Sequence, residues 1–257
     1  MLLGAIQGIA EWLPISSTGH LRLAEHFLDL SIPILFDVIL HIGTLIVIFV
    51  FFREDIKKIL SALIHLDFRT EYGQLIPLII VGTIPTALIG LVAIDTVETL
   101  SHNILPIAIA LILSGTLLYS SKTAREKTDN ISYKTAIIFG IAQGIAIMPG
   151  ISRSGTTIAV ALLLGLKREK AFKFSFLLSI PAIIGALGLT IYKEHAALAS
   201  TGFGGIEILT GAAIAMIVGY LALKLLHKII TEKKFYLFAF YCWLLGALLI
   251  VLALSGF

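Results

Sequence analysis

Long apolar segments, separated by short polar ones, follow one another along the whole of this chain. A helix that crosses a membrane needs about 20 mostly apolar residues. Six segments come close to this length, at residues 33–52, 75–94, 104–121, 173–191, 207–226 and 236–255. The pattern therefore predicts an all-α integral membrane protein with six transmembrane helices.

Two further apolar regions are interrupted in the middle by a polar turn. The predicted helices are 3–13 and 18–29 in the first region, and 134–147 and 154–165 in the second. Pro14 breaks the first region and Pro149-Gly150 breaks the second, because proline removes a backbone donor and both residues favour turns. Each region is predicted to be a re-entrant helical hairpin, which is tolerated at membrane depth where it is buried in protein or lines a wet cavity.

The two hairpin regions repeat one another at a constant offset of 136 residues. Residues 4–20 and 140–156 align without a gap and are identical at eight of 17 positions. The offset extends to the later spans, so the single membrane domain divides into halves at 1–128 and 129–257. Each half holds one hairpin and three spans. Because three is an odd number, the second half should be inverted relative to the first.

The positive charges agree with this inverted-topology repeat. Sixteen of the 19 Lys and Arg residues lie in four segments, the first of which is a predicted loop after the first span. The repeat places all four segments on one face, which is then the cytoplasmic one. Those residues are Arg53, Lys57, Lys58, Arg69, Lys122, Arg125, Lys127, Lys134, Lys167, Arg168, Lys170, Lys173, Lys224, Lys228, Lys233 and Lys234. The two hairpins should then dip from opposite sides, with their turns meeting near the middle. Eight full spans with parallel halves are the alternative, and the charge distribution argues against them.

Composition narrows the class of protein further. The chain is 58% hydrophobic and only 14% charged, whereas a soluble domain is about 25% charged. Nucleic-acid binding has no support, because the basic residues are scattered at the ends of apolar segments. Cys242 is the single cysteine, so no intramolecular disulfide can form, and the first residues do not resemble a signal peptide. The oligomeric state is left open, a homodimer included.

Hydroxyl groups stand where the second helix of each hairpin is predicted to begin. They belong to Ser16, Ser17 and Thr18 in the first hairpin, and to Ser152 and Ser154 in the second. Serine and threonine are good N-caps, and a helix start favours an anion through its free N–H groups. Arg153 could grip phosphate oxygens in a bidentate manner. The predicted ligand is therefore a phosphate or diphosphate at membrane depth.

A simpler interpretation is that these hydroxyls only cap two helices. It does not account for Arg153, because a bare arginine in the membrane costs several kcal/mol unless it is paired.

A second polar group belongs to the first hairpin. Gln7 and Glu11 lie four residues apart on one helix face, and His20 follows the polar turn. A carboxylate beside a phosphate would repel it unless a cation such as Mg²⁺ or Ca²⁺ bridges the two, which makes Glu11 and Gln7 candidate metal ligands. His20 could act as general acid or base and Ser17 as nucleophile. Two simpler interpretations stay open, namely an ion pair between Glu11 and Arg153 and a structural role for His20.

Other polar residues in apolar segments are weaker candidates. Asp37 and His41 lie four apart in the first span and could line the cavity, although Asp37 could equally pair with Arg22 or cap a helix. Residues 95–103, which include charged side chains, are predicted to be an exposed loop.

Two long motifs resemble those of a known family. The first reads Gln7-Gly-Ile-Ala-Glu11 and continues as Pro-Ile-Ser-Ser-Thr-Gly-His at 14–20. The second reads Pro-Gly-Ile-Ser-Arg-Ser-Gly-Thr-Thr at 149–157. Both are similar to motifs of the undecaprenyl-diphosphate phosphatases associated with bacitracin resistance, and the resemblance runs over essentially the whole chain.

The resemblance implies a metal-dependent hydrolase that cleaves undecaprenyl diphosphate to the monophosphate and inorganic phosphate. Such an enzyme recycles the lipid carrier for cell-wall polysaccharide synthesis. We expect it in the plasma membrane, with its active site open to the outer, periplasmic side.

Residue roles follow from the same resemblance. Glu11 would bind metal or act as acid or base, Ser17 and His20 are the nucleophile or base, and Arg153 grips phosphate. The expected substrate contacts are Ser16, Thr18, Ser152, Ser154 and Thr157. Many members have Glu where this chain has Gln7, and an amide cannot carry charge or a proton, which argues against a mechanism with two carboxylates.

Two competing functions remain. A transporter or flippase for the polyprenyl phosphate carrier would share the inverted repeat and the midplane site. Glu11 and His20 favour the enzyme, because binding phosphate alone needs neither beside it. A structural or partner-binding membrane protein would leave both buried motifs without a purpose.

Overall fold

The computed structural model describes residues 1–29, 34–101, 103–193 and 205–255. Within this part of the chain the structure is helical, with one isolated β-bridge between Thr128 and Leu166. The helices are α1 (Leu2–Trp12), α2 (Ser17–Leu28), α3 (Ile34–Phe51), α4 (Arg53–Ile64), α5 (Glu71–Ser101), α6 (Ile104–Ser120), α7 (Tyr133–Ile145), α8 (Arg153–Leu163), α9 (Arg168–Lys193), α10 (Gly205–Thr231) and α11 (Phe238–Leu254). Two short 3₁₀ turns, η1 (Ser121–Thr123) and η3 (Phe235–Leu237), follow α6 and precede α11.

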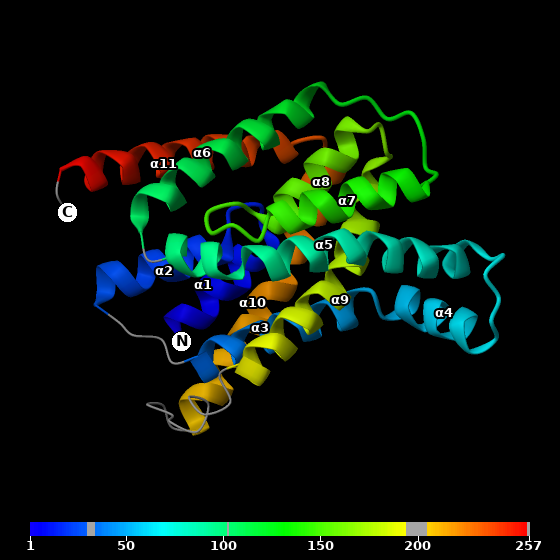
Figure 1. The fold of residues 1–257 in the computed structure, drawn as a ribbon, viewed down its shortest axis with the longest axis horizontal. Coiled ribbons are helices and arrows are strands. Elements are labelled where there is room, and N and C mark those ends of the chain that lie inside the picture. The colour runs from blue at the N-terminus through cyan, green and yellow to red at the C-terminus, as the bar shows by residue number, and fades with distance from the viewer. Residues whose placement is uncertain (30–33, 102, 194–204, 256–257) are drawn as a thin grey trace.

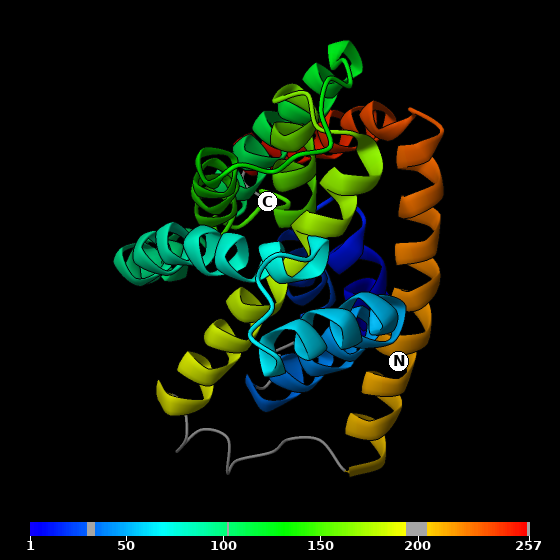
Figure 2. The same cartoon turned by 90° about the vertical axis from the view of Figure 1, so that its right-hand side faces the viewer.

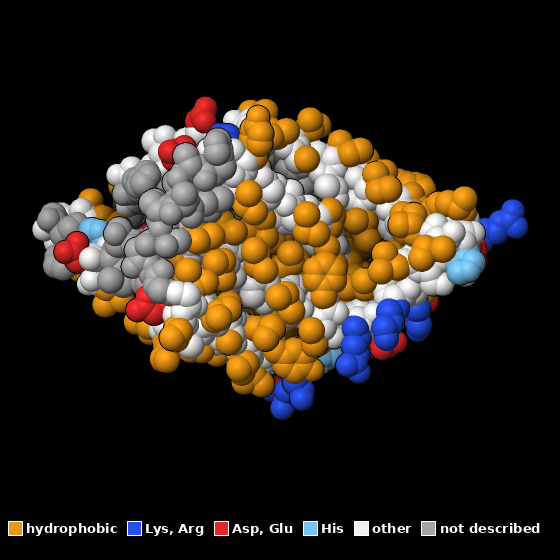
Figure 3. Space-filling view, turned by 90° about the horizontal axis from the view of Figure 1, so that it is seen from below, with side chains coloured by type: hydrophobic (Ala, Val, Ile, Leu, Met, Phe, Trp, Pro, Cys, Tyr) orange, Lys and Arg blue, Asp and Glu red, His pale blue; other side chains and the backbone are white. Residues whose placement is uncertain are grey.

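The long helices carry the predicted spans. Among the described residues, five helices are long and apolar enough to cross a membrane, namely α5, α9, α10, α6 together with η1, and α11 together with η3. The pair α3 and α4 passes the same test together, although it is bent by 79°, and gives a sixth span if it is counted as one. Hydrophobic side chains spread over most of the face in Figure 3, and Lys and Arg gather toward one end. The chain is a multi-pass helical membrane protein.

The prediction of an exposed loop at 95–103 is wrong for most of its residues. Residues 95–101 continue α5, and Thr99 Oγ1 donates a hydrogen bond to Asp95 O one turn earlier at 2.8 Å. Helical hydrogen bonding continues past the apolar segment because these residues carry no helix-breaking proline or glycine. Asp95 and Glu98 are exposed as expected, and His102 lies outside the described residues.

A second correction concerns the charged segment that follows the first span. It was expected to be a loop, but most of it forms α4. Ile56 and Ile59 lie three residues apart on this helix and pack against the main hydrophobic core. Apolar residues at this spacing form one buried face of an amphipathic helix, so the charges mark its other face and do not interrupt it.

Each hairpin turns at the predicted place and has the predicted cap. Ser16 Oγ accepts a hydrogen bond from Gly19 N at 3.3 Å to cap α2, and Ser152 Oγ accepts from Gly155 N at 3.1 Å to cap α8. Gly150 has φ of +95°, and a Cβ there would lie 2.5 Å from a backbone oxygen of α6. In Figure 1 the two hairpins extend from their turns toward opposite ends of the molecule.

Helices from before and after the middle of the chain pack against one another. Helix α1 runs along α10, which stands on one side of the molecule in Figure 2, and α7 runs along α5. Both contacts are close approaches of backbone. A Cβ at Gly4 would lie 2.4 Å from Gly211 O, and one at Gly140 would lie 2.0 Å from Gly82 O. Glycine at these two positions lets the short hairpin helices lie directly against the long spans.

Ion pairs join the basic segments at one end of the molecule. Lys173 Nζ lies 2.6 Å from Asp55 Oδ1 on α4, and Lys167 Nζ lies 2.9 Å from Asp129 Oδ2. Lys170 also pairs with Glu71, and Arg168 with Glu126. The start of α9 is thereby tied to α4, to α5 and to the segment before α7.

Candidate active site

The turns of the two hairpins touch one another. Ser16 Oγ accepts a hydrogen bond from Gly150 N at 3.2 Å, in addition to the bond that caps α2. In the other direction, Ser154 Oγ donates to Trp12 O at 3.0 Å. Each turn therefore satisfies polar groups of the other, and the starts of α2 and α8 are held side by side.

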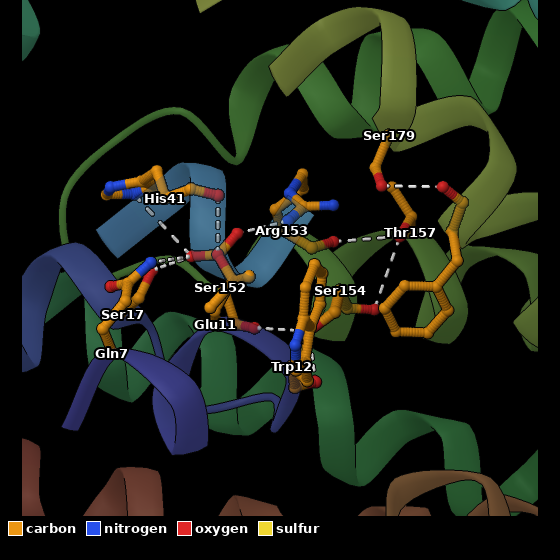
Figure 4. Close-up of polar contacts among 12 residues, drawn as sticks. Gln7, Glu11, Trp12, Ser17, His41, Ser152, Arg153, Ser154, Thr157 and Ser179 are labelled. Atoms are coloured by element: carbon orange, nitrogen blue, oxygen red, sulfur yellow. Dashed lines mark hydrogen bonds and ion pairs between the residues drawn. The ribbon is translucent and has the colours of Figure 1, made fainter. Parts of the chain in front are cut away.

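The carboxylate of Glu11 lies at the centre of this junction. Its Oε1 accepts a hydrogen bond from Arg153 Nη2 at 2.5 Å, and its Oε2 accepts from Ser17 Oγ at 2.6 Å and from Gln7 Nε2 at 3.2 Å. Figure 4 shows Ser17, Gln7, Arg153 and His41 around this group. The Glu11 side chain is 8% exposed and that of Arg153 17%, so the pair is shielded from solvent. The structure thus brings together four of the predicted site residues.

Arg153 and Ser17 hold equivalent places in the two repeats. The offset of 136 maps Ser17 onto Arg153, and each is the first residue of its helix, α2 or α8. Their side chains therefore start from helix N-termini, where free N–H groups favour an anion. The guanidinium of Arg153 also lies over the Trp12 ring, 5.7 Å from its centroid. The ring face supports the cation without neutralising it.

His20 is turned toward α11. Its Nδ1 donates to Ser16 O at 2.8 Å, and its Nε2 lies 2.6 Å from the hydroxyl of Tyr241. The two rings are stacked with centroids 5.7 Å apart. A neutral ring that donates from Nδ1 accepts at Nε2, so the Tyr241 hydroxyl is the donor. These contacts fit the structural interpretation of His20, because both of its ring nitrogens already have partners in the protein.

Three of the other predicted substrate contacts, Ser152, Ser154 and Thr157, form hydrogen bonds within the protein itself. Ser152 Oγ caps α8 and lies 3.2 Å from Ser154 Oγ, and Thr157 Oγ1 donates to Arg153 O at 2.9 Å. Thr18 is half-buried in the first turn of α2. The contacts of Ser152 and Thr157 thus lie at the start of α8, next to Arg153 in the chain.

His41 is the residue of this group that the sequence placed only among the weaker candidates. Its Nε2 lies 3.9 Å from Glu11 Oε2. Its Nδ1 donates to Asp37 O at 2.9 Å and lies 3.5 Å from Asp37 Oδ1. The signal in the sequence was a pair of ionisable residues four apart within an apolar span. Such residues in a membrane segment indicate function by default.

The oxygen atoms of the junction decide how well a cation fits. Among the described residues, no group of three or more His, Cys, Asp or Glu side chains is placed to hold a metal ion. Gln7 Oε1 is buried and has no hydrogen-bond partner, and it lies on the side chain that bonds Glu11. One carboxylate and one free amide oxygen fit Mg²⁺ or Ca²⁺ as part of a site that phosphate oxygens complete.

Known proteins resemble this chain over its whole length. Residues 1–248 match the family described as bacitracin resistance protein BacA. A protein named undecaprenyl-diphosphatase from Methanosphaera stadtmanae is 43% identical, across 98% of this chain and 96% of its own. A protein of the same name from Carboxydothermus hydrogenoformans is 40% identical, across 100% of this chain and 97% of its own. Another, from Treponema denticola, is 42% identical, across 96% of this chain and 93% of its own. A match to the family over residues 1–248, together with relatives about 40% identical over nearly their whole length, shows that this chain is a member of the BacA family.

Proposed function

We propose that this protein hydrolyses undecaprenyl diphosphate to undecaprenyl phosphate and inorganic phosphate, and so recycles the lipid carrier of cell-wall polysaccharide synthesis. The family and the name that its curated relatives share support this activity. The observation that carries it is the junction itself. A serine hydroxyl donates to a buried carboxylate at 2.6 Å, and an arginine occupies the other carboxylate oxygen.

The chemistry follows from these contacts. Ser17 Oγ attacks the terminal phosphorus, its proton passes to Glu11 Oε2, and the bond from phosphorus to the bridging oxygen breaks to release the lipid phosphate. Water then attacks the phosphoserine. Glu11 returns to Ser17 Oγ the proton that it took in the first step, and the attacking water keeps one proton on the inorganic phosphate and gives the other to solvent as that phosphate leaves. Arg153 and the N–H groups at the starts of α2 and α8 stabilise the charge that develops on the phosphoryl oxygens.

A divalent cation is part of this proposal. Glu11 and Gln7 Oε1 would hold Mg²⁺ or Ca²⁺ together with oxygens of the diphosphate. The ion would supply positive charge to the departing phosphate group. Gln7 would contribute its Oε1 atom, which has no hydrogen-bond partner, and Glu11 would contribute its carboxylate.

The membrane arrangement that suits this site is six spans with two re-entrant hairpins in an inverted repeat of residues 1–128 and 129–257. The exchange of partners supports it, because the offset maps α1 onto α7 and α5 onto α10, and α1 packs on α10 while α7 packs on α5. The opposite directions of the two hairpins agree with it (Figure 1). The isoprenyl tail would leave the junction between spans into lipid.

The protein would lie in the plasma membrane with its basic end in the cytoplasm. The site would then open outward. Asp37, whose side chain is 45% exposed, lies beside His41 near the beginning of α3, and α3 runs from there toward the basic segment that begins at Arg53. The path from Glu11 through these residues therefore leads away from the basic end.

Phosphate release from undecaprenyl diphosphate by the purified protein tests the activity. Ser17→Ala and Glu11→Gln should each lower turnover by at least about a hundredfold, and Ser61→Ala, at an exposed serine of α4, should leave it unchanged. Near-normal turnover in Ser17→Ala together with its loss in His20→Ala would assign the nucleophile to histidine. Movement of lipid phosphate across vesicle membranes without any phosphate release would favour the transporter.

A further inference from the structure

The basic segments of this protein differ in how far their charge is neutralised. At the start of α9 every cation described above is paired with a carboxylate. The pairs are Lys167 with Asp129, Arg168 with Glu126, Lys170 with Glu71 and Lys173 with Asp55. These segments therefore present no excess of positive charge to an outside anion.

A second group of basic residues lies where α6 ends and where α10 is followed by η3 and α11. Lys228 and Lys234 share one carboxylate, that of Glu232, at 3.9 and 2.8 Å. Lys122, in η1, and Lys233 have no carboxylate within ion-pair distance among the residues that the structure describes. This group keeps an excess of positive charge, which attracts anionic lipids when it lies at a membrane surface.

Two tyrosines hold Lys122 in place. Its Nζ lies 5.1 Å from the ring centroid of Tyr236 in η3 and 5.5 Å from that of Tyr119 on α6. The two rings contact each other edge to face, with centroids 6.2 Å apart. Aromatic faces attract a cation without neutralising it. Because Lys122 is also exposed, its charge remains available to an anion.

The two tyrosines lie where two adjacent spans end. Helix α6 with η1 and helix α11 with η3 are both long and apolar enough to cross a membrane, and they pack along each other with η1 against η3 (Figure 1). Further along α11, Phe240 is 52% exposed, and the Trp243 ring lies 5.3 Å from that of Tyr119. Aromatic side chains gather at the level of the lipid headgroups, so cations and apolar surface adjoin one another here.

The turn after α10 carries a lysine where glycine is favoured. Lys233 has φ of +63°. Its N–H donates to Ile230 O and that of Lys234 to Ile229 O, both at 3.0 Å, which is the pattern that ends many helices with a left-handed glycine. A side chain is strained in this conformation. Strain that persists at a position points to a use for the residue there.

We propose that Lys122, Lys233 and Lys234, together with Tyr119 and Tyr236, bind the phosphate headgroup of an anionic phospholipid in the adjacent membrane leaflet. The lysines supply the positive charge, and the tyrosine hydroxyls are donors for the phosphate oxygens. A lipid fits this basic patch better than free phosphate does, because exposed aromatic surface lies beside the cations to receive its chains. The inference is independent of the proposed hydrolysis.

Quenching of fluorescence by brominated lipids tests the patch. The chain has two tryptophans, of which Trp12 is fully buried and Trp243 adjoins the patch. The protein is placed in vesicles of equal parts phosphatidylglycerol and phosphatidylcholine, with bromine on the chains of one lipid or of the other. Brominated phosphatidylglycerol should quench Trp243 more strongly than brominated phosphatidylcholine does. This preference should weaken at high salt.

Substitutions locate the preference. Lys122→Gln should lower it about fivefold, the loss expected for one basic residue at an anionic membrane surface, and adding Lys234→Gln should remove most of what is left. Lys233→Gly should lower the preference by a similar factor without lowering the unfolding temperature, because glycine tolerates the positive φ. Lys57→Gln is the matched control, since Lys57 is an exposed lysine paired with Glu54 on α4, and it should leave the preference unchanged.

Three results would overturn the proposal. Equal quenching by the two brominated lipids would mean that the lysines only orient the protein in the membrane. A preference that is unchanged in folded Lys122→Gln and Lys233→Gly variants would place the lipid elsewhere. Loss of the preference on adding inorganic phosphate at matched ionic strength would assign the patch to free phosphate. Failure of the proposed hydrolysis would leave all these measurements as they are.

Discussion

The ion pair between Glu11 and Arg153 is buried, and its burial predicts how much its loss would lower the free energy of unfolding. Replacing Arg153 by Met removes the cation and leaves a carboxylate whose side chain is 8% exposed. Two unit charges about 4 Å apart interact with about 4 kcal/mol at an effective dielectric constant of about 20. Breaking a buried pair from one side costs about 3–5 kcal/mol. Arg153→Met should therefore lower the free energy of unfolding by about 3–5 kcal/mol.

Unfolding in mixed micelles, followed by helical circular dichroism as the denaturing detergent increases, measures this change. Lys228→Met is the matched control, because Lys228 and Glu232 form a pair at 3.9 Å whose side chains are 73% and 39% exposed. An exposed pair is worth about 0–1 kcal/mol. Adding Glu11→Gln to Arg153→Met should recover most of the loss, since no buried charge is then left alone. The reasoning is refuted if Arg153→Met costs no more than Lys228→Met.

Three further predictions concern packing, the hairpin turns and the cation. Gly140→Ala should lower the free energy of unfolding by about 1–3 kcal/mol or more, because its Cβ would lie 2.0 Å from Gly82 O. Gly185→Ala is the control in the same unfolding assay and should be tolerated, because a Cβ there meets nothing within 4 Å. Ser16→Ala should lower the free energy of unfolding by about 1–3 kcal/mol, since it leaves Gly150 N and the start of α2 without their acceptor. A loss below about 0.5 kcal/mol in that assay would contradict the hydrogen-bonded linkage of the two turns. Chelation should abolish phosphate release and added Mg²⁺ or Ca²⁺ should restore it; full release after dialysis against chelator would remove the cation from the mechanism.

Much of this protein is determined locally, and the sequence alone predicts that part well. Within the described residues, each of the six apolar segments predicted as a span falls mainly on a helix, because the length and hydrophobicity of a segment decide whether it can cross a membrane. The turns at Pro14 and Gly150 and the caps by Ser16 and Ser152 depend on backbone rules that act within a few residues. The local rules were misleading at α4, where charges on one face of an amphipathic helix were taken for a loop.

Which residues share the site depends on contacts between residues that are far apart in the sequence, and sequence patterns within a few residues do not predict such contacts. Glu11 and Arg153 are 142 residues apart in the chain and meet because the hairpin turns touch. The motif places His20 next to the polar turn, yet the rotation of α2 directs its ring to Tyr241 on α11. The packing of α3 brings His41 to Glu11 instead. The sequence determines which helices form and which polar residues they carry, whereas the rotation of each helix about its axis, set by packing against its neighbours, decides which of those residues share one carboxylate.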